Sequence, residues 1–299
     1  MENKKKMYKR RDFLEGIVKA GTAGLLVVPA IQNLQPEQPL TVAEIIDIIV
    51  REIPGGKLPD TVDTIKAGSG DQIVSGIVTT MFATVKVIEE AARQKANFII
   101  AHEPTFYNHT DDINWVQNNK VVNQKQELLQ KHQIAVWRFH DYWHRMKPDG
   151  ILHGVLLKTG WIQYSPKDEM DFQIPAQSLG NLVDHLKKTL GIPHLRVIGD
   201  LSASCSSISL LPGAWGGQRQ VGAVEKSNTD LLIVGESSEW ETPEYIRDAR
   251  SLGKPISMII LGHALSEEPG MEWLVQWLQP KVPGIRITHM PSGEAFTWL

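Results

Sequence analysis

The chain has 299 residues, of which 42% are hydrophobic and 22% are charged, and its formal net charge is −3. This composition is ordinary for a globular protein, and a chain of this length can bury a sufficient core without disulfides. The single cysteine, Cys205, excludes an internal disulfide. It stands in Ser-Ala-Ser-Cys-Ser-Ser with no base beside it, so we expect a buried structural cysteine rather than a nucleophile.

Residues 1–30 differ from the rest of the chain and are typical of an export signal. They begin with a cluster of lysines, continue through Arg10-Arg11-Asp-Phe-Leu into a weakly apolar stretch over 17–28, and reach small residues at Ala30. The paired arginines resemble a bacterial twin-arginine signal, and a lysine and glycines in the apolar stretch argue against a membrane span. We therefore expect export through the twin-arginine translocase and a periplasmic or extracellular location. The alternatives are an amphipathic N-terminal helix and a retained anchor.

Residues 31–40 form a polar linker with two prolines, and residues 41–299 form the remaining domain. Without residues 1–30 the chain keeps 24 basic and 31 acidic residues, a formal net charge of −7. A mildly acidic body argues against nucleic-acid binding, which normally uses a basic patch. No later segment is long and apolar enough for a stable membrane span.

Helix and strand signals alternate along the domain. Thr41 and Glu44 form a capping-box pattern that begins an amphipathic helix, which runs to about residue 53 and is ended by Pro-Gly-Gly at 54–56. Periodicity predicts further helices over 84–95, 119–131, 178–190, 243–251 and 272–278. Short apolar runs predict strands over 73–81, 97–101, 134–139, 206–211, 230–234 and 256–261. This alternation predicts an α/β architecture.

Histidines and carboxylates follow four of the expected strands. They are His102 and Glu103, His140 and Asp141, Glu236, and His263 with Glu267. Ligands of open α/β sheets bind beyond the carboxyl ends of the strands, so we expect these side chains to share one rim. Imidazole and carboxylate groups together suit Zn, Mn or Fe(II).

Each of these patterns also has a purely structural explanation. His102 and Glu103 could be a surface pair, and His140 and His144 could be unrelated histidines at a common spacing. Ser266 could be the N-cap of a helix, in which case the acidic residues after it would only favour the helix start. The position of all these groups after consecutive strands favours a metal site. The histidines at 109, 132 and 289 follow no pattern, and we expect them on the surface.

Other chemistry finds little support in the sequence. Gly-x-Ser-x-Gly, Gly-x-x-x-x-Gly-Lys-Ser/Thr and Gly-x-Gly-x-x-Gly motifs are absent. The run Gly213-Ala-Trp-Gly-Gly217 could approach an anion through its N–H groups, although a tight turn is the more common use of such a run. The nine tryptophans are scattered, which favours core and subunit-interface roles over sugar stacking.

Several of these segments also carry a family likeness. Phe-Ile-Ile-Ala-His-Glu-Pro at 98–104 stands where the family has an apolar strand and His-His-Pro, and His-Asp-Tyr-Trp-His at 140–144 stands where it has His-Thr-Asn-x-Asp. Asp-Leu-Leu-Ile-Val-Gly-Glu at 230–236 and Gly-His-Ala-Leu-Ser-Glu at 262–267 match its last two motifs. From about residue 41 to 299 the chain thus resembles the Nif-three-like family (NGG-interacting factor-like, also labelled GTP cyclohydrolase I type 2-like).

The resemblance implies two similar interlocked α/β lobes with a two-metal site in the cleft between them, and ring-shaped homo-hexamers. The ligands it implies for two divalent ions (Zn, Fe or Mn) are His102, Glu103, His144, His263 and Glu267, with His140 and Asp141 as further candidates. Glu103 stands where the family usually has a ligand histidine, and His144 where it usually has a ligand aspartate. The exchange keeps three histidines and two carboxylates, which favours a variant site over a lost one and leaves the metal identity open.

Three functions compete at this point. The first is a metal-dependent hydrolase, in which Glu103 or Glu236 moves protons. The second is a non-catalytic metal-binding hexamer that serves as a scaffold or a metal store. The third is a periplasmic module that binds a carbohydrate or a peptide, which the strand-end residues favour least.

Overall fold

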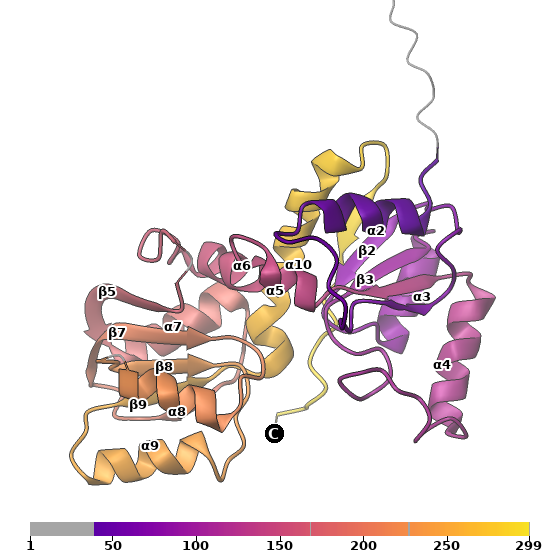
Figure 1. The fold of residues 1–299 in the computed structure, drawn as a ribbon. Helices are drawn as coiled ribbons and strands as arrows, with labels where there is room; N and C mark the ends of the chain where they lie inside the picture. The colour runs from indigo at the N-terminus through magenta and orange to yellow at the C-terminus, as the bar shows by residue number, and fades with distance from the viewer. Residues whose placement is uncertain (1–38, 168, 227, 299) are drawn as a thin grey trace, which may run out of the picture. The chain divides into compact units, whose positions relative to one another are not determined.

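The computed structural model describes residues 39–167, 169–226 and 228–298. The expected export signal over 1–30 and most of the expected linker over 31–40 lie outside the described residues. From Pro39 onward the chain forms one compact unit. Within the described residues, its strands build two five-stranded mixed sheets, each accompanied by helices (Figure 1). The expected α/β class with two lobes is therefore confirmed.

The first sheet has the strand order β1-β4-β3-β2-β10. Its strands are β1 (Ile65–Ala67), β2 (Ile77–Thr80), β3 (Phe98–Ala101), β4 (Ala135–Arg138) and β10 (Ile287–His289). Strands β10, β2, β3 and β4 run parallel, and β1 pairs antiparallel with β4 at one edge. Every residue of β2, β3 and β4 is buried, which explains why these strands are nearly continuous apolar runs.

The second sheet has the order β5-β7-β8-β9-β6. Its strands are β5 (Asp171–Ser178), β6 (Arg196–Ile198), β7 (Ser204–Leu211), β8 (Leu231–Val234) and β9 (Ser257–Ile260). Strands β7, β8 and β9 run parallel, and β5 and β6 are antiparallel edge strands. The two sheets are therefore alike, since each has parallel central strands and an antiparallel edge.

The helices carry local signals that explain where they begin and end. The α-helices are α2 (Val42–Arg51), α3 (Val85–Arg93), α4 (Lys120–Lys131), α5 (Asp141–Arg145), α6 (Gly150–Thr159), α7 (Leu179–Leu190), α8 (Gly217–Lys226), α9 (Thr242–Ser251) and α10 (His263–Leu278), followed by the 3₁₀ turn η1 (Gln279–Lys281). The capping box at Thr41 and Glu44 is present. Thr84, Asn119 and Ser178 cap three further helices through side-chain oxygens.

Helix α10 and strand β10 connect the two lobes. Helix α10 packs against α6 and α7 on one side and against β2 and β10 on the other, and β10 then completes the first sheet (Figure 1). Glycines let α6 and α10 approach closely, because a Cβ at Gly154 would lie 2.5 Å from the Cα of Gly270. The last strand of the chain thus returns to the sheet that the first strands began, as expected for interlocked lobes.

Most expected elements are present, and the largest difference concerns α10. The sequence places this helix at 272–278 with Ser266 as a candidate N-cap, whereas the helix begins at His263 and contains Pro269. The Ser266 hydroxyl instead donates to the backbone oxygen of His263, 2.7 Å away, and accepts from the backbone nitrogen of Gly213. The N-cap interpretation of Ser266 is therefore wrong, because that residue lies inside the first turn of the helix.

Seven elements have no counterpart in the sequence prediction: β1, β5, β6, β10, α5, α6 and α8. Strands β1, β6 and β10 have only three residues each, and β5 is an edge strand with several exposed positions. Helix α6 is buried on several faces and therefore lacks the one-sided apolar periodicity that indicates a surface helix. Helix α5 has only five residues, too few for a periodic signal.

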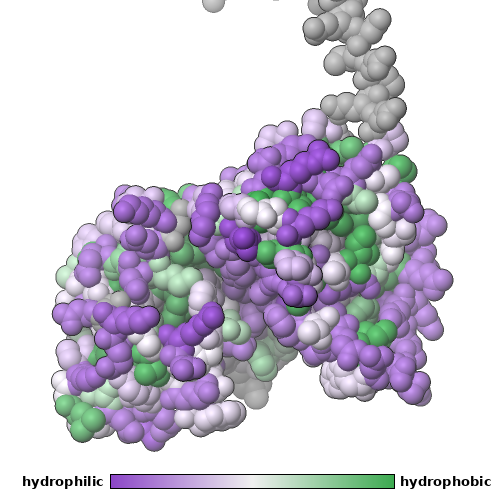
Figure 2. All heavy atoms as spheres, in the orientation of Figure 1, coloured by the Kyte–Doolittle hydropathy of each residue, from purple (hydrophilic) through white to green (hydrophobic). Residues whose placement is uncertain are grey.

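The surface that Figure 2 shows is mostly hydrophilic, with small apolar patches scattered between charged side chains. Cys205 is buried and free of any disulfide, as predicted. Among the described residues, Trp137, Trp143 and Trp161 belong to the core, whereas Trp115 and Trp240 are exposed. None of the helices that the structure describes has the length and apolarity needed to cross a membrane.

Candidate metal centre

The site is built where strands of both sheets end. His102 and Glu103 directly follow β3, and His140 stands two residues after β4, at the start of α5. From the second sheet, His263 is the first residue of α10, shortly after β9. The strand-end residues therefore do share one site, but its two sides come from different sheets rather than from one rim.

Helices α5 and α10 add one ligand candidate each. His144 lies one turn after His140 on α5, and Glu267 lies one turn after His263 on α10, so each pair faces the same side of its helix. Glu267 is 3% exposed and His102 is fully buried, whereas His263 is about one quarter exposed. The site thus has a closed floor and a partly open side.

All four histidines are held in the same way, through Nδ1. His102 Nδ1 lies 3.0 Å from the backbone oxygen of Phe139, and the acceptors of the other three are carboxylates. These pairs are His140 with Asp141 at 2.8 Å, His144 with Asp149 at 3.0 Å, and His263 with Glu236 at 3.1 Å. An acceptor on Nδ1 fixes the tautomer and the ring orientation, and it leaves Nε2 as the free donor atom of a metal-ligating histidine.

The four Nε2 atoms lie close to two buried carboxylates. His263 Nε2 is 3.1 Å from Glu103 Oε1 and 3.2 Å from Glu267 Oε2. His102 Nε2 is 3.8 Å from Glu267 Oε2, and His144 Nε2 is 4.0 Å from Glu267 Oε1. His140 Nε2 is 4.0 Å from Glu103 Oε1. Imidazole nitrogens and carboxylate oxygens therefore converge on one small region.

Three buried atoms of this region make no hydrogen bond within the described residues. They are His102 Nε2, Glu267 Oε2 and Arg138 Nη2, of which the last two lie at ion-pair distance from His263 and Glu103. A buried polar atom without a partner costs free energy, so such atoms are rare and call for an explanation. Two groups have ligand atoms within 4.8 Å of one another: His102 with His140 and His144, and His102 with Glu103 and Glu267. The donor set and its unpaired atoms fit divalent metal ions.

Burial and neighbouring charges shift the ionisation of these groups. Burial, followed by the nearby His140 and His144, holds the pKa of His102 well below its usual value, and burial also lowers the pKa of His140. Burial raises the pKa of Glu267. Burial alone would lower the pKa of His263, but hydrogen bonds to carboxylates, Glu103 first, raise it to about 12. Two neutral imidazoles are thus available, while His263 is a cation among carboxylates when no metal is bound.

Asp141 is a further ligand candidate in the same stretch as His144, and its carboxylate oxygens have other partners. One of its oxygens pairs with His140 Nδ1, and the other accepts from the Thr61 hydroxyl at 2.8 Å and the Val62 backbone nitrogen at 3.1 Å. Both carboxylate oxygens of Asp141 are thus occupied by hydrogen bonds, whereas His144 Nε2 lies 4.0 Å from Glu267 Oε1.

Three supporting residues have no signal in the sequence analysis. Asp63 accepts from the backbone nitrogens of His140, Asp141 and Tyr142, at 2.8–3.1 Å, and so holds the start of α5. Asp149 caps α6 with one oxygen while the other holds His144. Arg138, at the end of β4, is fully buried beside Glu103. Asp63 acts through contacts with residues almost 80 positions away, and Arg138 pairs with Glu103, 35 positions earlier, so no local motif marks either of them.

Gly213 lies directly against the Glu267 carboxylate. A Cβ at Gly213 would be 2.6 Å from the Cδ carbon of Glu267, and the residue also has a positive φ of 76°. Its backbone nitrogen donates to Ser266, so the run at 213–217 is a tight turn that packs on the site.

We expect Gly213→Ala to destabilise the protein more than Gly216→Ala. Gly216 has nearly the same φ, 74°, but a Cβ there would meet nothing within 4 Å. Both variants have the backbone strain of about 1–2 kcal/mol, and only Gly213→Ala adds overpacking of about 1–3 kcal/mol. Thermal unfolding of both variants checks this expectation. Equal unfolding temperatures would contradict the close packing of Gly213 on Glu267.

The remaining histidines follow the surface expectation only in part. His109 is exposed, and His132 is partly exposed. His289 is only partly exposed, since its side chain is 14% exposed and pairs with Glu268 at 3.0 Å. Its Nδ1 also lies 3.1 Å from the Thr79 hydroxyl of the neighbouring strand β2. The partial burial of His289 follows from β10 joining the first sheet, which the sequence did not indicate.

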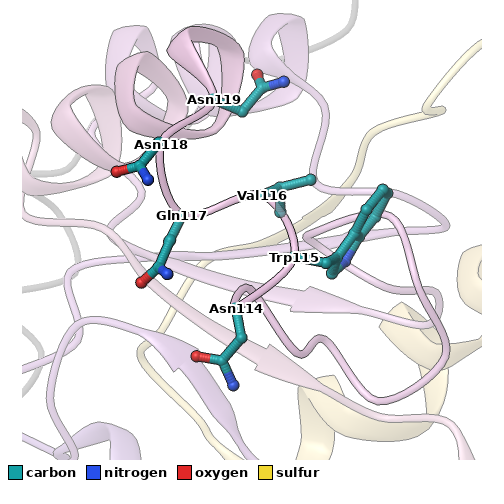
Figure 3. A pocket seen from close by; sticks show the side chains of 6 residues that line it. All are labelled: Asn114, Trp115, Val116, Gln117, Asn118 and Asn119. Atoms are coloured by element: carbon teal, nitrogen blue, oxygen red, sulfur yellow. The ribbon is translucent and has the colours of Figure 1, made fainter.

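A separate surface pocket carries no comparable chemistry. It has a volume of about 300 Å³ and is lined by Asn114, Trp115, Val116, Gln117, Asn118 and Asn119. Figure 3 shows that these side chains point in different directions and do not converge on a centre. The lining has amides and apolar groups but no titratable group.

A family model described as Duf34/NIF3 (NGG1p interacting factor 3) matches residues 41–293. The chain belongs to the DUF34/NIF3 family. The family inferred from the sequence motifs is thus confirmed. The curated relatives of this DUF34/NIF3 chain include a "GTP cyclohydrolase 1 type 2 homolog" of Clostridium perfringens, 25% identical over 236 residues, which cover 74% of this chain and 85% of that protein. A relative of the same name from Clostridium acetobutylicum is 24% identical, over 68% of this chain and 76% of its own length.

Solved structures show the same fold. A hypothetical protein of Staphylococcus aureus aligns with a TM-score of 0.69 and 15% identity, covering 87% of this DUF34/NIF3 chain and 100% of its own. A Bacillus cereus protein described as related to NIF3 aligns with a TM-score of 0.68 and 14% identity, covering 87% and 99%. At this identity the likeness supports the two-lobed α/β architecture and nothing finer.

Proposed function

We propose that this chain binds two divalent metal ions and acts as a metal-dependent hydrolase. One observation carries the proposal: four histidines are each fixed through Nδ1, and their Nε2 atoms face two buried carboxylates, Glu103 and Glu267. Histidines in ordinary cores or surfaces have no reason to share this arrangement, whereas it is usual for metal ligands. The ligands we propose are His102, Glu103, His144, His263 and Glu267, together with His140.

The two oxygens of Glu267 face different sides of the site. Oε1 lies toward His144, and Oε2 lies toward His102 and His263. A carboxylate in this position can bridge two ions about 3.5–4 Å apart. A bound pair of divalent ions would supply an activated water and a clamp for a substrate oxygen.

Side chains of the partly open side can hold and move protons there. Glu236 is 55% exposed and accepts from His263 Nδ1, so it reaches both solvent and the site. Glu103 is buried and paired with His263 and Arg138, which favours a role as a ligand over a role as a proton carrier. We therefore propose Glu236 as the group that moves protons.

Metal analysis and turnover together test this function. We expect two equivalents of metal per purified chain, and metal-dependent hydrolysis within a panel of phosphoester, amide and purine-nucleotide substrates. The names of the curated relatives justify including GTP. Two bound ions without turnover of any substrate would favour the scaffold or metal-store alternative. A chain that binds neither Zn²⁺, Mn²⁺ nor Fe²⁺ would overturn the proposal.

Two further properties stay predictions from the sequence. Export by the twin-arginine route is supported by Arg10 and Arg11, and homo-hexamer assembly is supported by the family resemblance. Exposed Phe296 and Trp298 are compatible with a subunit interface.

A further inference from the structure

The ligand candidates divide into two chemically different groups. His102, His140 and His144 form a three-histidine group, with ring centroids 4.8–5.1 Å apart. Glu103, Glu267 and His263 form a carboxylate group on the other side. Two ligand atoms that bind the same ion at about 2.1 Å lie about 3.0–3.4 Å apart. His263 Nε2 meets this condition with Glu103, at 3.1 Å, and with Glu267, at 3.2 Å.

His102 could belong to either group by distance alone, because its ligand atom lies near all the others. His263 Nε2 lies 3.1 Å from Glu103 and 3.2 Å from Glu267. His102 Nε2 is farther from Glu267, at 3.8 Å. The ring of His102 meanwhile packs beside those of His140 and His144. These contacts place His102 in the three-histidine group.

Arg138 keeps Glu103 in the carboxylate group. Its Nη2 lies 3.5 Å from Glu103 Oε2, while Oε1 faces His263. The guanidinium is fully buried and held in place, because Nε donates to the backbone oxygen of His102 at 3.2 Å and Nη1 donates to that of His109. Nη1 also lies 3.7 Å from Asp111. Oε2 of Glu103 thus lies toward Arg138 at ion-pair distance, and Oε1 is the oxygen that lies toward the other ligand candidates.

We propose that the two metal positions are unequal and that Arg138 is the positioning residue that keeps them so. The three-histidine position prefers a zinc-type ion, since imidazole suits Zn and Fe, and the carboxylate position prefers a harder ion such as Mn²⁺ or Mg²⁺. Glu267 would contribute to both, because its Oε1 lies 4.0 Å from His144 and its Oε2 lies 3.2 Å from His263 and 3.8 Å from His102. This inference rests on the proposed two-metal function, and it adds a different metal preference for each half of the site.

Sequential loading of the metal-free full-length protein tests the inequality. The protein receives one equivalent of Zn²⁺ and then excess Mn²⁺, and bound metal is measured after desalting by mass spectrometry and by the electron paramagnetic resonance of Mn²⁺. We expect one Zn and one Mn per chain. We expect Glu103→Gln to weaken Mn²⁺ binding at least tenfold and to retain Zn²⁺, and His144→Ala to do the reverse. His109→Ala is the control, since this exposed histidine lies beside His140 but in neither group, and it should change nothing.

Substitutions of Arg138 distinguish a role in positioning Glu103 from a general effect on folding. We expect Arg138→Met, studied at low temperature, to lose the mixed Zn/Mn occupancy and to alter the Mn²⁺ spectrum, and Arg138→Lys to restore both. Two ions of one kind bound with equal affinity, or equal loss of Zn²⁺ and Mn²⁺ in Glu103→Gln, would overturn the inequality while leaving the two-metal function intact. Failure of the wild-type chain to bind either ion would overturn both.

Discussion

Replacing Glu267 by glutamine is expected to remove both metal ions at once. The two oxygens of its carboxylate lie toward different groups, Oε1 toward His144 and Oε2 toward His263, whereas one oxygen of Glu103 lies toward Arg138. Loss of a residue that merely orients a ligand weakens metal binding by about 10–100-fold, so loss of a bridging ligand should exceed about 100-fold. Calorimetric titration of the metal-free variant with Zn²⁺ and with Mn²⁺ measures the effect.

The metal-free form of this variant should remain folded. Burial raises the pKa of Glu267, and in this variant His263 keeps Glu103 and Glu236 as carboxylate partners, so the neutral amide is tolerated in the absence of metal. Glu272→Gln is the matched control, because Glu272 lies on the same helix but is exposed and pairs with Lys158 at 2.7 Å. Retention of both ions by Glu267→Gln, or equal loss by the control, would contradict the bridging role.

Replacing Arg138 by methionine is expected to lower the free energy of unfolding by about 3–5 kcal/mol. The change removes the buried guanidinium from beside Glu103 and Asp111, which keep His263 and Lys66, respectively, as partners. The loss of one partner of a buried ion pair is costly because the other charge stays out of water. For a chain of this size the loss corresponds to a fall of roughly 10 °C in unfolding temperature. Thermal and denaturant unfolding of the metal-free proteins measure it.

Arg196→Met is the control for burial. Arg196 pairs with Glu239 at 2.8 Å, a shorter distance than that between Arg138 and Glu103, but both side chains are about half or more exposed. An exposed pair is screened by water and should contribute under about 1 kcal/mol. If the two variants lose the same stability, desolvation is not what makes Arg138 important.

The sequence predicted the parts of this protein that depend on local patterns. The capping box at Thr41 predicted the start of α2, and the apolar runs that end before His102 and His140 predicted β3 and β4. The motif at 262–267 predicted that His263 and Glu267 lie together. They do so, because they stand one helical turn apart on α10. These features depend on neighbours in the chain.

The parts that the sequence did not predict depend on contacts between distant segments. In the sequence, Arg138 is a single polar residue within an apolar strand. Only the fold brings Glu103 and Asp111 beside it. The sequence indicates only that Gly213 is a turn glycine. Its close approach to Glu267 depends on the packing of the end of β7 against α10. His289 becomes partly buried because β10 joins a sheet whose other strands lie about 150 or more residues earlier in the chain.

Anomalous diffraction from crystals of the metal-loaded protein is the most direct test of the two-metal centre. We expect two peaks at the junction of the sheets, one among His102, His140 and His144 and the other beside Glu103 and His263, separated by about 3.5–4 Å with Glu267 between them. Data collected at the zinc and manganese absorption edges after sequential loading would assign one element to each peak. A single peak, or peaks bound only by surface histidines such as His109, would contradict the account.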